Sequence, residues 1–317
     1  MVVPPPLVLP PPLLVIVGPT GVGKTAVAAR LAASVPIEVV SADSRQVYRG
    51  MDAATGKPSS EERSAVRHHL LDLIEPGERY HAARFRLDAV CAIGAIRAAG
   101  RLPVVVGGTG LYVRALLRGL DPAPPADPRL RAELEEIARA QGPAVLHERL
   151  RTLDPERAAR LHENDRVRII RAIEKHGRAG TPAGSWARAT TPWSVLMFGL
   201  RRERRALNRS LEERARRMLA GGMMDEVRRL LAAGHDDTAP GMAGIGYRQW
   251  ARVARGDLSD AEALRLMVRD TQRYAKRQMT WFARERDIQW LDLDERGGVE
   301  GAAECIHKRL VREGWIA

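Results

Sequence analysis

The sequence predicts an α/β protein in which a parallel sheet flanked by helices carries an inserted all-helical domain. In the first third of the chain, apolar segments rich in β-branched residues alternate with helical patterns. Helical patterns alone then occupy the stretch between two breaks rich in proline and glycine, Asp121–Pro128 and Gly180–Gly184. An apolar segment, Trp193–Phe198, follows the second break and is predicted to return to the sheet. A sheet interrupted by a helical insertion accounts for all three observations.

The first predicted strand, Leu13–Val17, leads directly into a phosphate-binding loop. Gly18-Pro-Thr-Gly-Val-Gly-Lys-Thr25 fits the pattern G-x-x-x-x-G-K-[ST] at every fixed position, and an alanine-rich helical pattern follows it. Backbone N–H groups and the positive end of the helix bind an anion there, Lys24 adds a charge, and the Thr25 hydroxyl can ligate Mg²⁺. We therefore expect a P-loop NTPase-like core that binds a di- or triphosphate, ATP among the candidates. The residues assigned to this anion are Gly18, Pro19, Thr20, Gly21, Val22, Gly23, Lys24 and Thr25.

The next predicted elements are a strand at Ile37–Ser41, a short strand at His68–Ile74, a helix over Tyr80–Ala99 that ends before Gly100, and a strand at Leu102–Val106. Ligands of parallel sheets bind outside the carboxyl ends of the strands. Three of these ends carry distinctive residues, namely the phosphate loop, Asp43–Ser44 and Gly107–Gly110. Their convergence predicts one site at this edge of the sheet.

The domain organisation is expected to be a core domain, residues 13–121 and 193–317, with residues 122–192 as the inserted helical domain. Residues 1–12 are rich in proline and lack a basic start, so we expect a disordered leader and no secretory signal. Beyond Arg201 the pattern predicts helices, with turns at Gly221–Gly222 and Gly234–His235.

The formal net charge of +12 favours a polyanionic partner, above all a nucleic acid. A compositional preference for arginine is the alternative, but it does not explain the excess of bases over acids. Cys91 and Cys305 lie far apart, which excludes a disulfide framework and zinc spacing and fits a reducing compartment. No apolar segment reaches membrane-spanning length, so we expect no membrane partner. Together with the cysteine pattern and the leader, this predicts a cytoplasmic protein. We also expect a monomer.

Asp43 is the main acidic candidate, because no acid follows the Leu102–Val106 strand. A carboxylate beside a phosphate loop can act as a general base or hold Mg²⁺ through water, and the structural alternative is an Asx turn. Gly107–Gly110 either forms a simple turn or lets a backbone or base approach closely. His68 and His69 are adjacent, so on a strand they point to opposite faces and do not easily share a metal.

Arg168, Arg171, Lys175 and Arg178 share one helical face, with Val167, Ile169, Ile170 and Ile173 expected on the other. A solvated helix face and contact with a nucleic-acid backbone both explain such a stripe, and its place in an insertion beside a phosphate site favours the second. A second arginine-dense helix, Arg201–Arg217, can bring a guanidinium to the phosphate site. Tyr247–Trp250 and Arg273–Phe282 mix bases with aromatics, which suits stacking on an unpaired base; for Trp281 and Phe282 a core position is favoured.

Together these motifs resemble bacterial tRNA dimethylallyltransferases, also called tRNA isopentenyltransferases, from Leu13 to about Trp290. The matching stretches are Gly18–Thr25, Asp43–Asp52, Thr55–Pro58, His68–Asp72, Val106–Tyr112, Gly246–Gln249 and Lys276–Phe282. The resemblance implies transfer of a dimethylallyl group from dimethylallyl diphosphate to N6 of the adenosine just 3′ of the tRNA anticodon. That adenosine must be flipped out to reach the site.

The resemblance also implies roles for single residues. Asp43 accepts the N6 proton, Lys24 and the rest of the loop hold the diphosphate with Mg²⁺, Arg214 neutralises the leaving group, and Thr109 lies close to the base. Residues assigned to the tRNA, including its anticodon arm, are Asp43, Ser44, Arg45, Gln46, Thr109, Asp165, Arg166, Val167, Arg168, Ile169, Arg171, Gly244, Ile245, Gly246, Tyr247, Arg248 and Gln249.

Three departures from the family pattern stand out. Arg67 replaces a usual proline, Ser210 replaces an arginine one turn before Arg214, and the zinc-finger tail of eukaryotic relatives is absent. The alternatives are a transferase acting on free adenine nucleotides, a P-loop small-molecule kinase, and a non-enzymatic nucleic-acid-binding NTP switch. The basic insertion argues against the first, and the switch leaves Asp43 unexplained.

Overall fold

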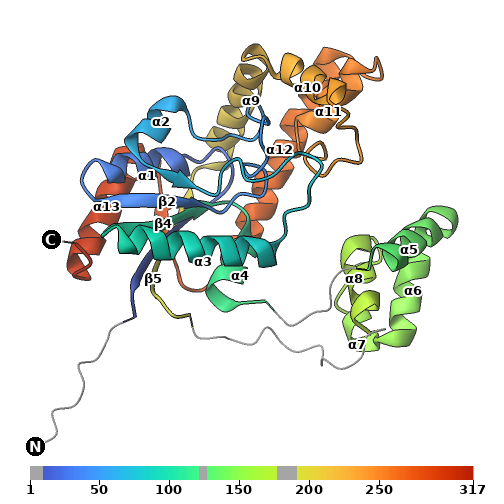
Figure 1. Ribbon diagram of the computed structural model, residues 1–317, viewed down its shortest axis with the longest axis horizontal. Helices are drawn as coiled ribbons and strands as arrows, with labels where there is room; N and C mark the ends of the chain where they lie inside the picture. Colours follow the sequence, from blue (N-terminus) through green and yellow to red (C-terminus); the bar gives the residue numbers. More distant parts are fainter. Residues whose placement is uncertain (1–9, 121–126, 177–190, 317) are drawn as a thin grey trace, which may run out of the picture. The chain divides into compact units, whose positions relative to one another are not determined.

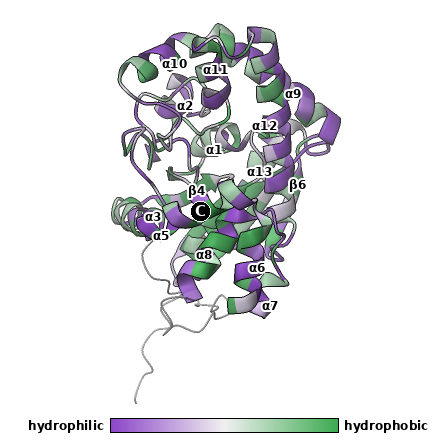
Figure 2. Ribbon diagram, turned by 90° about the vertical axis from the view of Figure 1, so that its right-hand side faces the viewer, coloured by the Kyte–Doolittle hydropathy of each residue, from purple (hydrophilic) through white to green (hydrophobic). Residues whose placement is uncertain are grey.

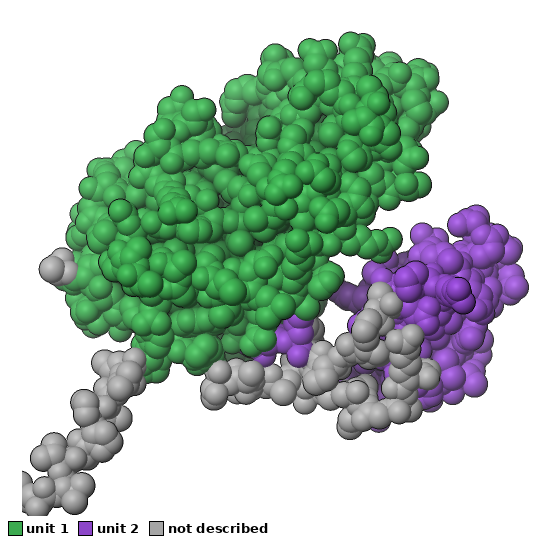
Figure 3. All heavy atoms as spheres, viewed as in Figure 1, with its two compact units in different colours: residues 1–117, 190–317 green, residues 118–189 purple. Residues whose placement is uncertain are grey.

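The structure is a computed structural model (Figure 1). It describes residues 10–120, 127–176 and 191–316. Most of the predicted leader, most of the Asp121–Pro128 break, the whole Gly180–Gly184 break and Arg178 lie outside these residues. The chain divides into two compact units (Figure 3): unit 1 comprises residues 1–117 and 190–317, and unit 2 comprises residues 118–189. Each unit is described by itself.

Unit 1 is built on a parallel sheet, as predicted. Over the described residues the strand order is β3-β2-β4-β1-β5-β6. The strands are β1 (Pro12–Val17), β2 (Ile37–Ser41), β3 (His68–His69), β4 (Leu102–Gly107), β5 (Ser194–Arg201) and β6 (Ile288–Asp292). Central β1 pairs with β4 and β5, with Leu14 opposite both Val104 and Leu196. The buried, β-branched residues of β1, β2 and β4 suit a sheet covered on both faces.

Strand β6 was missed by the sequence analysis, which predicted only helices beyond Arg201. It pairs with β5 alone, at the edge of the sheet. Ile288 and Leu291 are buried while Gln289 is exposed, so the strand shows only a partial alternation over five residues. Such a short pattern is easily taken for part of a helical region.

Helices cover both faces of the sheet (Figure 1). Helices α1 (Lys24–Ala32) and α13 (Gly298–Arg312) pack together on one face, against Leu14 and Ile16 of β1. Helices α3 (Ala82–Ala98) and α4 (Gly110–Arg118) lie on the opposite face, where α3 contacts β2 and β4. Short α2 (Ser60–Ala65) precedes β3 and begins with a capping box.

A second apolar cluster joins the segment after β2 to the C-terminal helices. These helices are α9 (Arg204–Ala220), α10 (Met223–Ala232), α11 (Tyr247–Ala254) and α12 (Asp260–Phe282). Val47, Met51 and Ile74 pack there against Tyr247 and Trp250. Helices α9 and α12, largely hydrophilic along their length (Figure 2), are thereby held beside the carboxyl ends of the strands.

The described residues of unit 2 form helices and the turns that join them. The helices are α5 (Pro128–Gln141), α6 (Ala144–Leu153), α7 (Pro155–Ala158) and α8 (Arg166–His176). Ile169, Ile170 and Ile173 of α8 are buried with leucines of α5 and α6. The prediction that Val167 shares this apolar face is wrong, because its side chain is 77% exposed. Val167 lies one turn before Arg171, so the helical period places it on the basic face.

No helix within the described residues is both long and apolar enough to cross a membrane.

Candidate active site

The phosphate loop joins β1 to α1 and has the backbone that its glycines permit. Gly21 and Gly23 have φ values of +76° and +106°, which side-chain-bearing residues rarely adopt. Helix α1 begins at Lys24, and no side chain caps it. Its first N–H groups are therefore left to an anion. Val22 differs from the other residues predicted to bind the anion, since its side chain lies in the core under the loop.

Lys24 is folded back over this loop. Its Nζ donates to the carbonyl oxygens of Gly18, at 3.0 Å, and Pro19, at 2.7 Å. Burial lowers the pKa of Lys24 to about 8, although the nearby carboxylate of Asp43 acts in the opposite direction. The loop therefore holds a desolvated ammonium group at the place where an anion would bind.

Gln278 of α12 ties the loop to the end of β4. Its Oε1 accepts from the Thr20 N–H at 2.8 Å, and its Nε2 donates to the Gly108 carbonyl at 2.9 Å. A Cβ on Gly108 would overlap Gln278, and one on Gly110 would overlap Trp281. The glycine run thus allows close packing of α12 side chains, and at these two glycines it leaves no room for a base.

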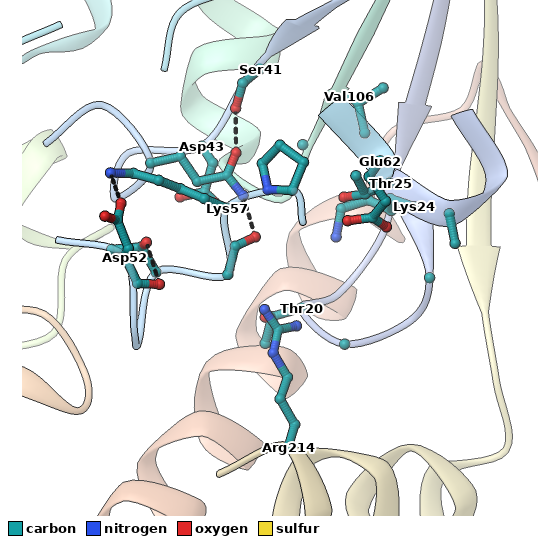
Figure 4. Close-up of a pocket in the computed structure, with 18 of the residues that line it drawn as sticks. Thr20, Lys24, Thr25, Ser41, Asp43, Asp52, Lys57, Glu62, Val106 and Arg214 are labelled. Atoms are coloured by element: carbon teal, nitrogen blue, oxygen red, sulfur yellow. Dashed lines mark hydrogen bonds and ion pairs between the residues drawn. The ribbon is translucent and has the colours of Figure 1, made fainter. Parts of the chain in front are cut away.

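A first cavity of about 570 Å³ opens over the loop (Figure 4). The phosphate loop contributes Thr20, Gly21, Gly23, Lys24 and Thr25 to its lining. The last residue of β2, Ser41, lines it with Asp43, Gln46 and Thr55–Pro58 of the following segment. Helix α9 adds Ser210, Arg214 and Arg217. The cavity therefore brings together the phosphate loop and the carboxyl end of β2, as predicted, with one face of α9.

Arg214 reaches from α9 toward Thr20 of the loop (Figure 4). Its guanidinium forms no hydrogen bond or ion pair with any other residue that the structure describes. Burial lowers the pKa of Arg214, and the charge of Asp43 opposes that shift. The guanidinium lies against Gly56, where a Cβ would overlap Nη2. An unpaired, desolvated cation beside a phosphate loop is suited to bind an anion.

Asp43 lies at the carboxyl end of β2. Its Oδ1 accepts from the Arg45 N–H at 2.8 Å, so the Asx turn considered as the structural alternative is present. Its Oδ2 has no hydrogen-bond partner among the described residues. Asp43 lines the first cavity and also a second one. The turn therefore holds the carboxylate at the junction of the two cavities.

The second cavity, of about 240 Å³, adjoins the first. Apolar side chains form much of it: Leu211, Ala215, Met218, Ala243, Ile245 and Met267. Its polar lining includes Ser44, Arg45, Arg248, Tyr274 and Arg277. Asp43 and Arg214 belong to both cavities, so a carboxylate and a guanidinium lie at the wall that the two chambers share.

Thr109 lies behind this second cavity and positions its wall. Its Oγ1 accepts from the Ser44 N–H at 3.1 Å, and its side chain lies close to the Tyr274 phenol. Burial raises the pKa of Tyr274 to about 12, which keeps the phenol protonated at neutral pH. Thr109 does not itself line either cavity.

The family model described as IPP transferase matches residues 46–285, and the one described as isopentenyl transferase matches residues 11–75. The chain belongs to the IPP transferase family. It is 46% identical to the tRNA dimethylallyltransferase of Thermomicrobium roseum over 303 residues, which are 94% of this chain and 91% of that protein.

Solved structures agree with this assignment. The full-length tRNA isopentenylpyrophosphate transferase of Bacillus halodurans is 36% identical, has a TM-score of 0.69, and is matched over 95% of this chain and 97% of that one. A eukaryotic dimethylallyltransferase solved acting on tRNA is 26% identical, with a TM-score of 0.71 and coverage of 89% and 74%.

Two charged side chains, Lys57 and Glu226, hold the loop over the first cavity of this IPP transferase. The sequence analysis assigned neither of them a role. Lys57, whose side chain is only 3% exposed, bonds to the Tyr48 carbonyl and to the carboxylates of Asp52 and Asp72. Glu226 of α10 accepts from the N–H groups of Asp52 and Ala53. Lys57 belongs to the Thr55–Pro58 motif, whereas no sequence signal marks Glu226.

Gln46 completes this support. Its Oε1 accepts from the Ser41 hydroxyl at 2.8 Å, and its Nε2 donates to the Gly56 carbonyl at 2.7 Å. Gln46 was assigned to the tRNA, but in this structure both ends of its amide bind within the protein. It fixes Gly56, and thereby the surface on which Arg214 rests.

The stacking role suggested for Tyr247 and Trp250 is wrong, because their rings are 1% and 0% exposed. The Tyr247 hydroxyl donates to Glu226, and Gln249 bonds to the Gly246 N–H and to Asp270. Within Gly244–Gln249 only Ile245 and Arg248 line either of these two cavities. The aromatic residues of α11 therefore belong to the core.

In unit 2 the predicted basic residues carry ion pairs of two kinds. Arg166 and Arg168 form exposed pairs with Glu135 and Asp165. Arg171 bonds to Glu174, a buried carboxylate that Arg131 also holds. Arg171 thus stabilises the fold of unit 2 by pairing with a buried carboxylate, while Arg168 is exposed at the start of α8.

Of the histidine pair, His69 bonds to Glu38, and Arg101 pairs with the same carboxylate. His68 lines the first cavity, with Nδ1 bonded to the Val66 carbonyl and Nε2 buried without a partner. At the neighbouring departure from the family pattern, the Arg67 carbonyl accepts from the Val39 N–H. The arginine therefore keeps a sheet hydrogen bond that a proline would also allow.

Proposed function

We propose that this chain transfers a dimethylallyl group from dimethylallyl diphosphate to N6 of the adenosine immediately 3′ of the tRNA anticodon. The carrying observation is that Asp43 and Arg214 are shared by a cavity over the phosphate loop and an adjoining cavity whose lining includes Leu211, Ile245 and Met267. The names of the relatives, tRNA dimethylallyltransferases, supply the two substrates.

The first cavity suits the diphosphate. Unpaired N–H groups of the loop and α1, Lys24 and Arg214 all face it. As the C1–O bond of the donor breaks, its electron pair passes to the diphosphate oxygen. Preorganised donors and cations stabilise that developing charge more than they stabilise the ground state.

The second cavity suits the acceptor base and the prenyl group. Its apolar lining fits an aromatic base and a branched five-carbon chain, and Asp43 stands at its junction with the first cavity. The N6 lone pair forms the new N–C1 bond, and the N6 proton passes to Asp43. An exocyclic amine is a weak nucleophile, so proton removal assists the bond as it forms.

A divalent metal, Mg²⁺, is the expected cofactor. The Thr25 hydroxyl and the carboxylates of Asp43 and Glu62 line the first cavity and offer oxygen ligands. In the described residues no group of three or more His, Cys, Asp or Glu side chains could hold a metal. Mg²⁺ at phosphate sites needs only one or two protein oxygens besides the substrate, so these residues fit. When bound, it would neutralise charge on the leaving diphosphate.

The tRNA is expected to bind both units. Ser44, Arg45, Arg248 and Arg277 line the second cavity, where the flipped base would enter. Unit 2, with Arg168 exposed on α8, is proposed to grip the anticodon arm through phosphate contacts. A monomer is proposed as the active form.

The decisive experiment offers the protein dimethylallyl diphosphate with unmodified tRNA, and in parallel with AMP. We expect N6-dimethylallyladenosine in digested tRNA by mass spectrometry, and no product from AMP. Product from AMP alone would favour a transferase of free nucleotides. ATP turnover with a small acceptor would favour a kinase, and binding without any product would favour a nucleic-acid-binding switch.

A further inference from the structure

Helix α9 presents one face to the first cavity at successive turns. Ser210, Arg214 and Arg217 all line that cavity, and the spacing of four and three residues places them on the same side of the helix. Arg214 already has a part in the proposed reaction. The arginine that often precedes it by one turn is Ser210 here, which leaves Arg217 as the second cation on this face.

Arg217 has no counter-charge within the described part of the chain. Its side chain is exposed and forms no hydrogen bond or ion pair with another described residue. The adjacent Arg216 differs, because its Nη2 bonds to Glu212 at 2.8 Å. Arg217 is also close enough to Arg214 for its positive charge to add to the effect of burial in lowering the pKa of Arg214. Two like charges on one helix face repel each other unless an anion lies between them.

The two cavities separate the tasks of these arginines. Arg214 lines both cavities and therefore lies where the dimethylallyl group would pass from the diphosphate to N6. Arg217 lines only the first cavity. Because it is exposed, it lies where that cavity opens to solvent.

We propose that Arg217 binds the terminal phosphate of the donor diphosphate at the mouth of the first cavity, and so supplies the charge that Ser210 does not. The inference rests on the proposed function, because it takes the donor to be a diphosphate. A guanidinium at the mouth contributes to capture and holding of the anion, whereas Arg214 acts on the oxygen that leaves.

The test measures binding of inorganic diphosphate with Mg²⁺ by titration calorimetry, and turnover with dimethylallyl diphosphate and tRNA. Arg217→Gln should weaken diphosphate binding by roughly tenfold, the loss of about one charge-assisted hydrogen bond. It should raise the KM for the donor with little change in kcat. Arg216→Gln, the matched control, should bind diphosphate as the wild type does. Adding Ser210→Arg to Arg217→Gln should restore most of the affinity.

Three results would overturn the inference. They are wild-type diphosphate affinity in Arg217→Gln, an equal loss in Arg216→Gln, or a loss of tRNA affinity with donor binding intact. Equal melting temperatures of the variants exclude a folding effect. Failure of the proposed function is a separate result, since it would appear as an inactive wild type whatever the diphosphate titrations show.

Discussion

The side-chain oxygen of Gln278 accepts a hydrogen bond of 2.8 Å from the backbone N–H of Thr20, which lies 258 residues earlier in the chain. The same amide donates to the carbonyl of Gly108. One buried side chain on α12 therefore holds the phosphate loop and the end of β4 together. It also uses the Thr20 N–H, so the backbone groups left for an anion begin at Gly21.

Gln278→Leu should loosen the phosphate loop. It leaves a buried N–H and a buried carbonyl without partners, which lowers the free energy of unfolding by about 1–3 kcal/mol. Thermal unfolding and the KM for the donor measure the effect, and we expect a lower melting temperature together with a raised KM. Lys276→Ala, at an exposed position on the same helix, is the control. A raised KM in both variants would argue against a specific role of Gln278.

Gly56→Ala should displace Arg214, because the new Cβ would overlap its Nη2. Loss of one preorganised charge at a leaving group lowers kcat by roughly 10²- to 10³-fold. Gly50→Ala is the matched control, since Gly50 has φ +65°, close to the +63° of Gly56, but no atom within 4 Å of its Cβ position. Both variants bear the same backbone strain, about 1–2 kcal/mol. Equal activity losses would show that strain alone is responsible.

Asp43→Asn should slow the chemical step while tRNA still binds. Asparagine keeps the size and the turn hydrogen bond to the Arg45 N–H but cannot accept the N6 proton. The single-turnover rate should fall by roughly two to four orders of magnitude. Asp225→Asn, an exposed residue of α10 paired with Arg228, is the control. A single-turnover rate near that of the wild type would remove Asp43 from the role of general base.

Arg168→Gln should weaken tRNA binding and flatten its dependence on salt. Each lost phosphate contact changes the slope of log affinity against log salt by roughly one. Arg160→Gln, also exposed and in unit 2, is the control. Arg171 is left unchanged because Glu174 depends on it. An unchanged slope in Arg168→Gln would identify this part of α8 as a solvated helix face.

The buried Glu174 makes the stability of unit 2 depend on pH. Burial alone would raise its pKa, but hydrogen bonds from Arg131, the Asp127 N–H and Arg171 outweigh burial and hold the pKa at about 2. That value lies below the ordinary 4.5. The stabilisation is therefore complete above the ordinary pKa and is lost as the pH falls toward 2.

Amide hydrogen exchange of residues 127–176, corrected for the intrinsic rate, measures this loss. We expect protection to decrease on acidification below about pH 4.5. Glu174→Gln, which cannot titrate, should remove this pH dependence while lowering protection at neutral pH. Wild-type protection that stays constant down to about pH 2 would contradict the prediction.

The sequence by itself determined the parallel sheet, the phosphate loop, Asp43 at the end of β2 and the helical insertion. These features depend on short-range patterns: an apolar strand, a loop with glycines at set positions, and a helical period. Local backbone preferences and burial act within a few residues, so a single stretch such as Gly18–Thr25 carries its own structural information.

Only the tertiary structure decided which distant residues complete the site. Gln278 reaches Thr20, Arg214 rests on Gly56, and Glu226 holds the Asp52 and Ala53 N–H groups, across separations that no local pattern encodes. The same holds for Tyr247 and Trp250, whose aromatic pattern fits both base stacking and a core. Burial of a ring depends on the elements packed over it, and those elements are brought there by the fold of the whole chain.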